Sequence, residues 1–144
     1  MKKYFLLAVL ATVLAACGTT NAGAPAASAK PGVVTVEVAY LNHPPVRPVL
    51  SDIDKLLATY GDKVSVSRYD FDTPEGTAFA KAKGITEHTP IAIFVNGSME
   101  LTLNGRDVKF YSFPQGQGTG MVAGGAWTVQ DLQQALDQAT GKAS

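Results

Sequence analysis

The sequence predicts an α/β domain in which helices flank a mixed central sheet. Apolar runs typical of buried strands alternate with segments whose apolar residues recur every three or four positions, an order that makes the first strands parallel. Farther along, an Asn-Gly pair between two strand-like segments indicates an antiparallel hairpin. The 144 residues, 46% hydrophobic and 17% charged, suit one domain with a core.

The first half of the domain is expected to form a strand, a helix and a second strand. Val33–Leu41 is β-branched and nearly continuous in apolar character, which predicts a strand buried on both faces. Three prolines in Asn42–Pro48 exclude helix, and the helix that follows has Pro48 in its first turn and Gly61 just beyond its end. Its apolar stripe consists of Val49, Leu50, Ile53, Leu56, Leu57 and Tyr60. Lys63–Asp72 is the second expected strand.

The second half begins with a short helix that runs from its N-cap, Thr73, to Gly84. Ile91–Val95 has the character of a buried strand. The Asn96-Gly97 turn is expected to return the chain as its partner strand, Met99–Leu103.

Two features lengthen the chain before the last helix. Asn104-Gly105 predicts another reversal, into Val108–Phe113, so that an extra hairpin forms. Pro114–Gly125 contains five glycines and is expected to be a loop. The last helix should then begin at the N-cap Thr128, with Asp131 placed to complete a capping box.

The N-terminus has the features of a targeting segment. Met1-Lys2-Lys3 is basic, and the next thirteen residues, 4–16, carry no charge. A basic start, a short apolar run and small residues are the parts of a secretory signal peptide. Thirteen residues are too few to span the hydrocarbon of a bilayer, which needs about 20. The small and polar residues from Gly18 to Pro31 then indicate a flexible tether.

Leu14-Ala15-Ala16-Cys17 resembles the lipobox of bacterial lipoproteins. The resemblance implies that the Cys17 sulfur receives a diacylglycerol, that residues 1–16 are removed as a lipoprotein signal peptide, and that the new amine receives an acyl chain such as palmitate. Two or three acyl chains suffice for stable anchoring. We therefore expect an exported protein with a lipidated Cys and tether at 17–31 and one domain at 32–144. Since Gly18 replaces the Asp of inner-membrane retention, the expected location is the outer membrane if the cell is Gram-negative, and otherwise the outer face of the cell membrane.

Residues 33–140 resemble a thioredoxin-family domain. The matching segments are Pro48–Asp72, Gly76-Thr77-Ala78, Lys83-Gly84-Ile85, Thr89-Pro90, Phe94, Asn96-Gly97, and Gly125-Ala126 with Leu132. The resemblance implies a thioredoxin-like three-layer sandwich. It also implies that Pro90 is the family's cis-proline and that Thr89 lines a groove and offers its backbone to an extended peptide. The extra hairpin and the Gly-rich loop before the last helix depart from the family pattern.

The family's redox cysteines are missing. The segment where the CxxC motif belongs is Asn42-His43-Pro44-Pro45, and Cys17 is the only cysteine in the chain. Disulfide exchange needs two thiols, and acylation would leave Cys17 without a free one. We therefore expect a redox-inactive domain without thiol-disulfide oxidoreductase activity and without catalytic residues of that kind.

The two histidines are the remaining candidates for chemistry. His43 and His88 lie in loops that the resemblance brings to one end of the sheet, where they could ligate a metal ion or act as an acid–base pair. Glu87, Asp72 or Met121 could add a ligand. The alternative is two exposed loop histidines with no shared role, because stable metal sites usually need three or four ligands. No cofactor is expected beyond such a metal ion and the covalent lipid.

A thioredoxin-like scaffold without its redox cysteines keeps a groove but no reactive group, which favours a binding function. Twelve Lys+Arg against twelve Asp+Glu give a formal net charge of zero, which argues against a nucleic-acid partner. We expect a membrane-anchored module that binds an envelope protein or an extended peptide where Asn42–Pro48, His88-Thr89-Pro90 and Gln115–Gly125 meet. The alternatives are metal-binding or His-dependent activity at His43 and His88, or a purely structural envelope lipoprotein.

Overall fold

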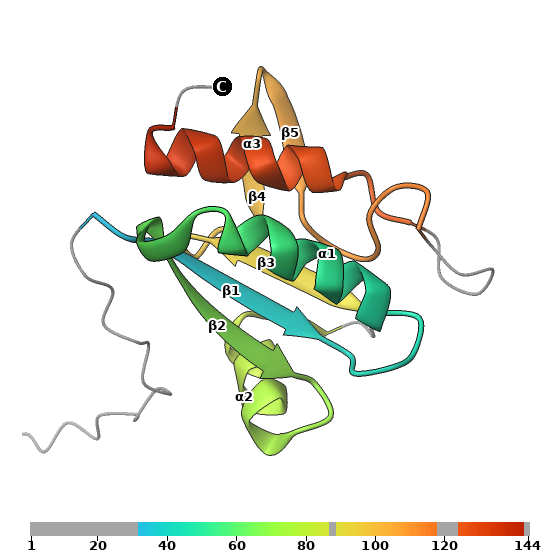
Figure 1. The fold of residues 1–144 in the computed structure, drawn as a ribbon. Coiled ribbons are helices and arrows are strands. Elements are labelled where there is room, and N and C mark those ends of the chain that lie inside the picture. The colour runs from blue at the N-terminus through green and yellow to red at the C-terminus, as the bar shows by residue number, and fades with distance from the viewer. Residues whose placement is uncertain (1–31, 87–88, 118–123, 143–144) are drawn as a thin grey trace, which may run out of the picture.

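The computed structural model describes residues 32–86, 89–117 and 124–142, which form an α/β domain with a mixed sheet and three α-helices (Figure 1). The predicted α/β class and the mixed sheet are confirmed. The signal peptide, the lipidated Cys17 and the tether were predicted within residues 1–31, so these predictions lie outside the described residues. Among the described residues, no helix combines the length and the apolar character that crossing a membrane requires.

Strand β1 (Val34–Tyr40) is the centre of a three-stranded sheet. It pairs in parallel with β2 (Val64–Asp70) and antiparallel with β3 (Ile91–Val95), in the order β2-β1-β3. The parallel pair is possible because helix α1 (Arg47–Ala58) and the short 3₁₀ turn Gly61–Lys63 carry the chain back between the two strands. The carboxyl ends of β1 and β2 therefore lie at the same end of the sheet.

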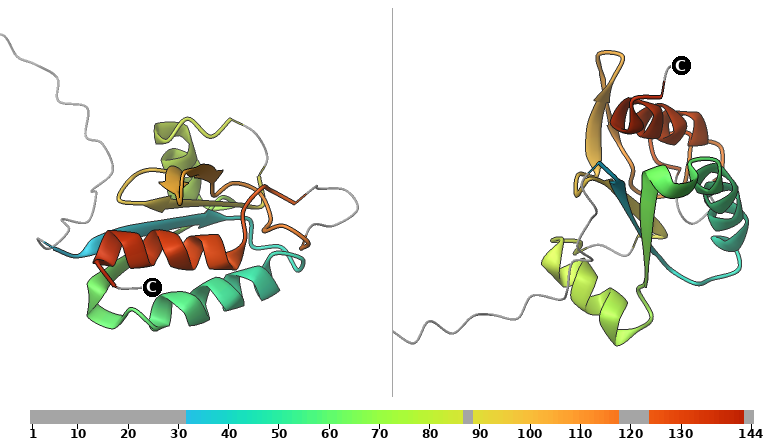
Figure 2. Two further views of the ribbon diagram at one scale, coloured as in Figure 1. Left: turned by 90° about the horizontal axis from the view of Figure 1, so that it is seen from above. Right: turned by 60° about the vertical axis from the view of Figure 1, so that its left-hand side comes forward.

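Helices cover both faces of this sheet (Figures 1 and 2). Helices α1 and α3 (Val129–Thr140) lie side by side on one face, and α2 (Pro74–Ala82) lies on the other. Because side chains alternate along the strands, one set of apolar residues points to the face covered by α1 and α3. This set is Val34, Val36, Val38, Ile91, Ile93 and Val95. They pack against the predicted stripe of α1, in which Val49, Ile53, Leu57 and Tyr60 are buried and Leu50 and Leu56 half-buried.

The α2 face carries a smaller and more aromatic cluster. Ala39, Ala92 and Phe94 of the sheet pack against Phe79 of α2, and the Tyr69 ring stacks on Phe79 with 3.8 Å between the centroids. The prediction that the first strand is buried on both faces is only partly right, because Thr35 and Glu37 on this face are half-buried. Alternation is therefore present in β1, although its second face carries small and polar residues.

The hairpin after β3 pairs differently from the prediction. The Asn96-Gly97 turn forms, and the Val95 backbone N–H donates to the Ser98 carbonyl at 2.9 Å. Strand β4 (Glu100–Leu103) then leaves β3 and pairs with β5 (Arg106–Lys109) in a separate two-stranded sheet. The chain returns to β3 only at Phe110, whose carbonyl accepts from Ile93 N at 3.0 Å.

The separate β4–β5 hairpin contacts α3 and buries apolar side chains there. Leu103 and Val108 join the α1/α3 core, and so do Phe110 and Phe113 beyond the hairpin. Trp127 closes the same region, with its Nε1 donating to the carbonyls of Tyr111 and Ser112. The extra hairpin is thus part of the core of the domain.

The helix starts follow the sequence closely. The Thr128–Asp131 capping box is present, with Thr128 N donating to Asp131 Oδ2 at 2.8 Å and Asp131 N donating to Thr128 Oγ1 at 3.1 Å. Thr73 caps α2 by accepting from Gly76 N at 3.1 Å. Gly76 is required there, since a Cβ would overlap the Asp70 carbonyl. Helix α2 can therefore pack its backbone directly against the end of β2.

Candidate functional site at the carboxyl ends of β1 and β2

The loops that follow β1 and β2 meet at the carboxyl end of the sheet. Leu41 N donates to the Pro90 carbonyl at 3.0 Å, and Phe71 N donates to the Tyr40 carbonyl at 2.8 Å. The described ends of the Gly-rich loop lie at the same end of the domain in both views (Figures 1 and 2). In α/β sheets, ligands bind beyond the carboxyl ends of parallel strands, so this end is the first place to look for a site.

A hollow of about 300 Å³ opens at this end, on the α2 side of the sheet. Its floor is apolar, because Leu41 and Phe71 leave β1 and β2 here, and Ala80 and Ile85 close it from α2 and the segment beyond. Hydroxyl groups add a polar component. The complete lining is Leu41, Phe71, Thr77, Ala80, Ile85, Thr86 and Thr89. An apolar cavity with a few polar groups is the usual form of a small binding pocket.

A histidine–aspartate pair lies next to this hollow. His43 Nε2 is 3.4 Å from Asp72 Oδ2, and the two residues stand close in sequence to Leu41 and Phe71 of the hollow. Both side chains are about half exposed, 52% for His43 and 54% for Asp72, so the pair contributes little to stability. It is, however, accessible to a ligand, and it places a donor and an acceptor at the rim.

The segment that replaces the redox motif is on the surface. Asn42, His43, Pro44 and Pro45 are all exposed, while Val46 is buried and fixes the end of the segment. Val46 N donates to the His43 carbonyl at 2.9 Å, which closes a tight turn. Asn42 Oδ1 accepts from Arg47 Nε at 3.4 Å. This segment can meet a partner, but it offers no sulfur for exchange chemistry.

The prediction that the Thr89–Pro90 peptide bond is cis is wrong. No peptide bond between described residues is cis, so the Thr89–Pro90 bond is trans. Thr89 is also only 2% exposed, and its hydroxyl donates to the Ile91 carbonyl at 3.1 Å. The trans form is the ordinary preference of an X–Pro bond. With its hydroxyl turned inward, Thr89 forms part of the wall of the hollow.

The metal hypothesis is not decided by the described residues. They contain no group of three or more His, Cys, Asp or Glu side chains placed to hold a metal ion. His43 has Asp72 as its neighbour, whereas His88, Glu87 and Met121 lie outside the described part of the chain. Metal binding at His43 and His88 therefore stays a prediction.

Sequence reasoning found the loops of this site but missed the hollow itself. Phe71, Ala80 and Ile85 were considered only as strand, helix or core residues. Their convergence depends on the close approach of α2 to the end of β2, which Gly76 permits. The glycine in the first turn of a helix was the available signal.

No protein-family model matches the sequence, and no curated protein matches it. The resemblances to bacterial lipoproteins and to thioredoxin-family domains therefore rest on the quoted residues alone.

Proposed function

We propose that this chain is an exported, lipid-anchored domain of the thioredoxin type that lacks redox chemistry and binds an extended segment of an envelope protein. The parallel β1–β2 pair, the antiparallel β3 and the helices on both faces support the fold assignment. The Leu14-Ala-Ala-Cys17 sequence supports the anchor. A single cysteine in the whole sequence supports the absence of a dithiol cycle.

The observation that carries the binding proposal is the apolar hollow at the carboxyl end of the sheet. A segment lying across this end would place one Leu or Phe side chain over Leu41 and Phe71. Its backbone would then lie beside the exposed His43–Asp72 pair. Burying one such side chain contributes about 2 kcal/mol, which suits a reversible client or partner contact.

Short peptides test this proposal directly. The probes are uncharged, end-blocked seven-residue peptides that differ only in the central residue, which is Leu, Phe or Ser. Titrated against the full chain in dodecylphosphocholine micelles, the Leu and Phe peptides should bind at least about tenfold more tightly than the Ser peptide. Equal affinity for the three peptides would contradict the proposal.

A matched pair of variants locates the binding. Ala80 lines the hollow and Ala78 is exposed on the same helix. Ala80→Trp should fill the hollow and remove the preference for Leu and Phe, whereas Ala78→Trp should keep it. Loss of the preference in both variants, with unchanged circular dichroism, would mean that the hollow is not the site.

The anchor is tested separately by mass. The wild-type chain, expressed in a bacterial host, should begin at Cys17 and carry the mass of its acyl chains. Cys17→Ser should be neither acylated nor cleaved at this position. A wild-type protein that starts at Met1 or has a free thiol would overturn the anchor without affecting the peptide result.

A further inference from the structure

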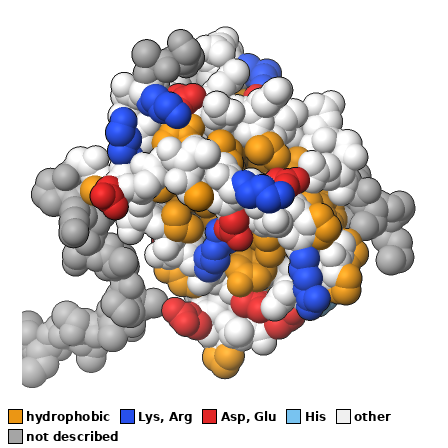
Figure 3. Space-filling view, viewed as in Figure 1, with side chains coloured by type: hydrophobic (Ala, Val, Ile, Leu, Met, Phe, Trp, Pro, Cys, Tyr) orange, Lys and Arg blue, Asp and Glu red, His pale blue; other side chains and the backbone are white. Residues whose placement is uncertain are grey.

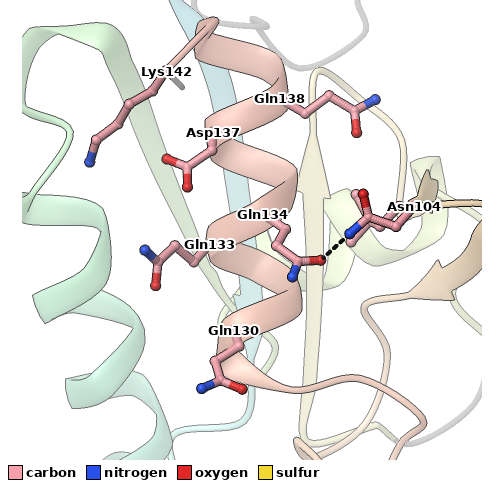
Figure 4. A pocket seen from close by; sticks show the side chains of 8 residues that line it. Asn104, Gln130, Gln133, Gln134, Asp137, Gln138 and Lys142 are labelled. Carbon is pink, nitrogen blue, oxygen red and sulfur yellow. Dashed lines mark hydrogen bonds between the residues drawn. The ribbon is translucent and has the colours of Figure 1, made fainter. Parts of the chain in front are cut away.

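A second hollow, of about 660 Å³, lies over helix α3. Five amide side chains line it: Asn104, Gln130, Gln133, Gln134 and Gln138. Figure 4 shows Gln134 and Gln138 directed toward Asn104 at the tip of the β4–β5 hairpin, and Gln133 directed toward the side on which α1 lies. All four glutamines are exposed, and Gln130, Gln134 and Gln138 lie at i, i+4 and i+8 on one stripe of α3. Gln133 lies beside this stripe, on the α1 side, and the four side chains with Asn104 are here called the amide strip.

The carboxylates of α3 are withdrawn from this surface. Asp131 is 6% exposed, and its oxygens accept from Thr128 N and from Arg106 Nη2. Asp137 is 7% exposed and accepts from the Tyr60 hydroxyl at 2.8 Å. Burial of Tyr60, together with this hydrogen bond, raises the Tyr60 pKa well above its ordinary value. Both carboxylates thus accept hydrogen bonds within the fold. Asp137 is part of the lining of the hollow, but it is largely buried there, so the exposed side chains of the lining are mainly amides.

The amides themselves are exposed and largely available. Within the described residues, the side chains of Gln130, Gln133 and Gln138 make no hydrogen bond, and Gln134 Oε1 accepts from Asn104 Nδ2 at a long 3.4 Å. Each amide offers two donor hydrogens and an acceptor oxygen. A solvent-facing helix surface ordinarily mixes Lys, Arg, Glu and Asp. On the face seen in Figure 3, blue and red side chains are scattered over the surface, several of them next to one another.

We propose that this amide strip binds an uncharged, hydroxyl-rich glycan. Sugar hydroxyls both donate and accept, as the amides do, and an uncharged chain needs no counter-charge. This inference concerns a different surface from the peptide site and does not depend on it.

Other partner classes fit the strip less well. The one cation in the lining, Lys142, lies 4.9 Å from the Tyr60 ring centroid, so the strip has no row of cations for an anionic polymer. A peptide that binds by adding a strand needs the free edge of a sheet, which a helix face cannot provide. An apolar partner would find no exposed large apolar side chain in the lining, because Leu103 is 3% exposed.

Oligosaccharides of matched length test the proposal. Tetra-N-acetylchitotetraose and cellotetraose are the uncharged probes, and tetragalacturonate is the anionic one. The full chain is titrated in dodecylphosphocholine micelles, because a detergent with a sugar headgroup would compete. We expect at least one uncharged probe to bind about tenfold or more tightly than tetragalacturonate. Absence of binding by both uncharged probes, or tighter binding of tetragalacturonate, would overturn the proposal.

Variants then assign the binding to the strip. Gln134→Ala combined with Gln138→Ala should weaken the uncharged probe about tenfold, since each change removes hydrogen-bonding groups. Ser51→Ala combined with Ser65→Ala removes two exposed hydrogen-bonding side chains elsewhere and should leave the affinity for the uncharged probe unchanged. Equal affinity of the two double variants, with melting temperatures that match the wild type, would place the glycan elsewhere and contradict the assignment.

Discussion

The two faces of the sheet are built differently, although they share the same three strands. On one face, two 12-residue helices seal a continuous aliphatic core that also includes Phe110 and Trp127. On the other, a nine-residue helix covers a small aromatic cluster around Phe79 and Phe94. The first face therefore provides most of the stability, and the second leaves room for the hollow at the carboxyl end. The peptide site and the larger part of the core thus lie on opposite faces of the sheet.

The difference between the two faces of the sheet is found within strand β1 alone. Val36 and Val38 are fully buried under α1 and α3. Glu37, on the opposite face, accepts from Lys83 Nζ at 2.6 Å, and Lys83 also lies 4.7 Å from the Phe94 ring centroid. Because the α2 face is only partly covered, Glu37 and Lys83 keep some contact with solvent, which lowers the cost of an ion pair there. Lys83 can also make a cation–π contact with Phe94.

Trp127→Ala should have the largest effect, because it removes the biggest fully buried side chain of the sealed face. We expect a loss of about 4 kcal/mol in the free energy of unfolding. The indole hydrogen bonds to the Tyr111 and Ser112 carbonyls would be lost as well. Urea unfolding measures the loss. Val66→Ala, at a side chain 39% exposed on β2, is the control and should cost less than about 0.5 kcal/mol.

Gly76→Ala should cost about 2 kcal/mol, through overlap of the new methyl group with the Asp70 carbonyl. The effect should be local. Hydrogen exchange in α2 should accelerate, while α1 and α3 keep their protection. Ala78→Ser, in the same helix and exposed, should leave exchange unchanged. Uniform acceleration across the domain would show that the two faces are not energetically separate.

Lys83→Met should cost about 1 kcal/mol, because Glu37 would lose its partner while remaining about 80% buried. Lys81→Met is the matched control, since Lys81 is exposed, lies close to Lys83 at the end of α2 and has no ion pair among the described residues. Equal stabilities for the two variants, measured by urea unfolding, would mean that the Lys83–Glu37 pair contributes nothing.

Tyr60 should make stability depend on pH only in the alkaline range. Its pKa is raised in the folded state above the ordinary value of 10.0, by burial and by Asp137. The folded state therefore holds this proton more tightly, so its contribution is complete below pH 10 and is lost as the pH rises beyond that value. The difference in unfolding free energy between wild type and Tyr60→Phe should be constant near neutrality and shrink at higher pH. A difference independent of pH up to 11 would contradict this account.

Local patterns in the sequence predicted the elements well, for physical reasons. The stripe of α1, the Thr128–Asp131 box and the two Asn-Gly turns are set by residues close in sequence, and the structure has all of them. The second Asn-Gly turn correctly predicted the hairpin of β4 and β5, whereas the expected pairing of Met99–Leu103 with β3 was wrong. Beyond Ser98, β4 leaves β3, and Leu103 and Val108 pack in the α1/α3 core. Such a choice depends on contacts that no local pattern contains.

The candidate site was predictable only in outline. The loops at the end of the sheet follow from strand direction, and His43 was identified from its residue type. Its partner Asp72 was considered only as one of three possible further metal ligands. The 3.4 Å distance between His43 and Asp72 depends on the conformations of the loops that follow β1 and β2, which no local pattern predicts. Thr89 and Pro90 were placed by resemblance, yet the bond is trans and the threonine is buried. The hollow required four separate segments to converge.

The most direct test of the central claim, that the extended segment binds on the α2 face while the α1/α3 face holds most of the core, is hydrogen exchange on the full chain with and without the Leu-centred peptide. We predict that the peptide slows exchange in Phe71–Thr86, which includes α2 and most of the hollow. Exchange in α1 and α3 should not change. Slowing confined to α1 and α3, or no slowing at a peptide concentration that saturates binding, would contradict the account.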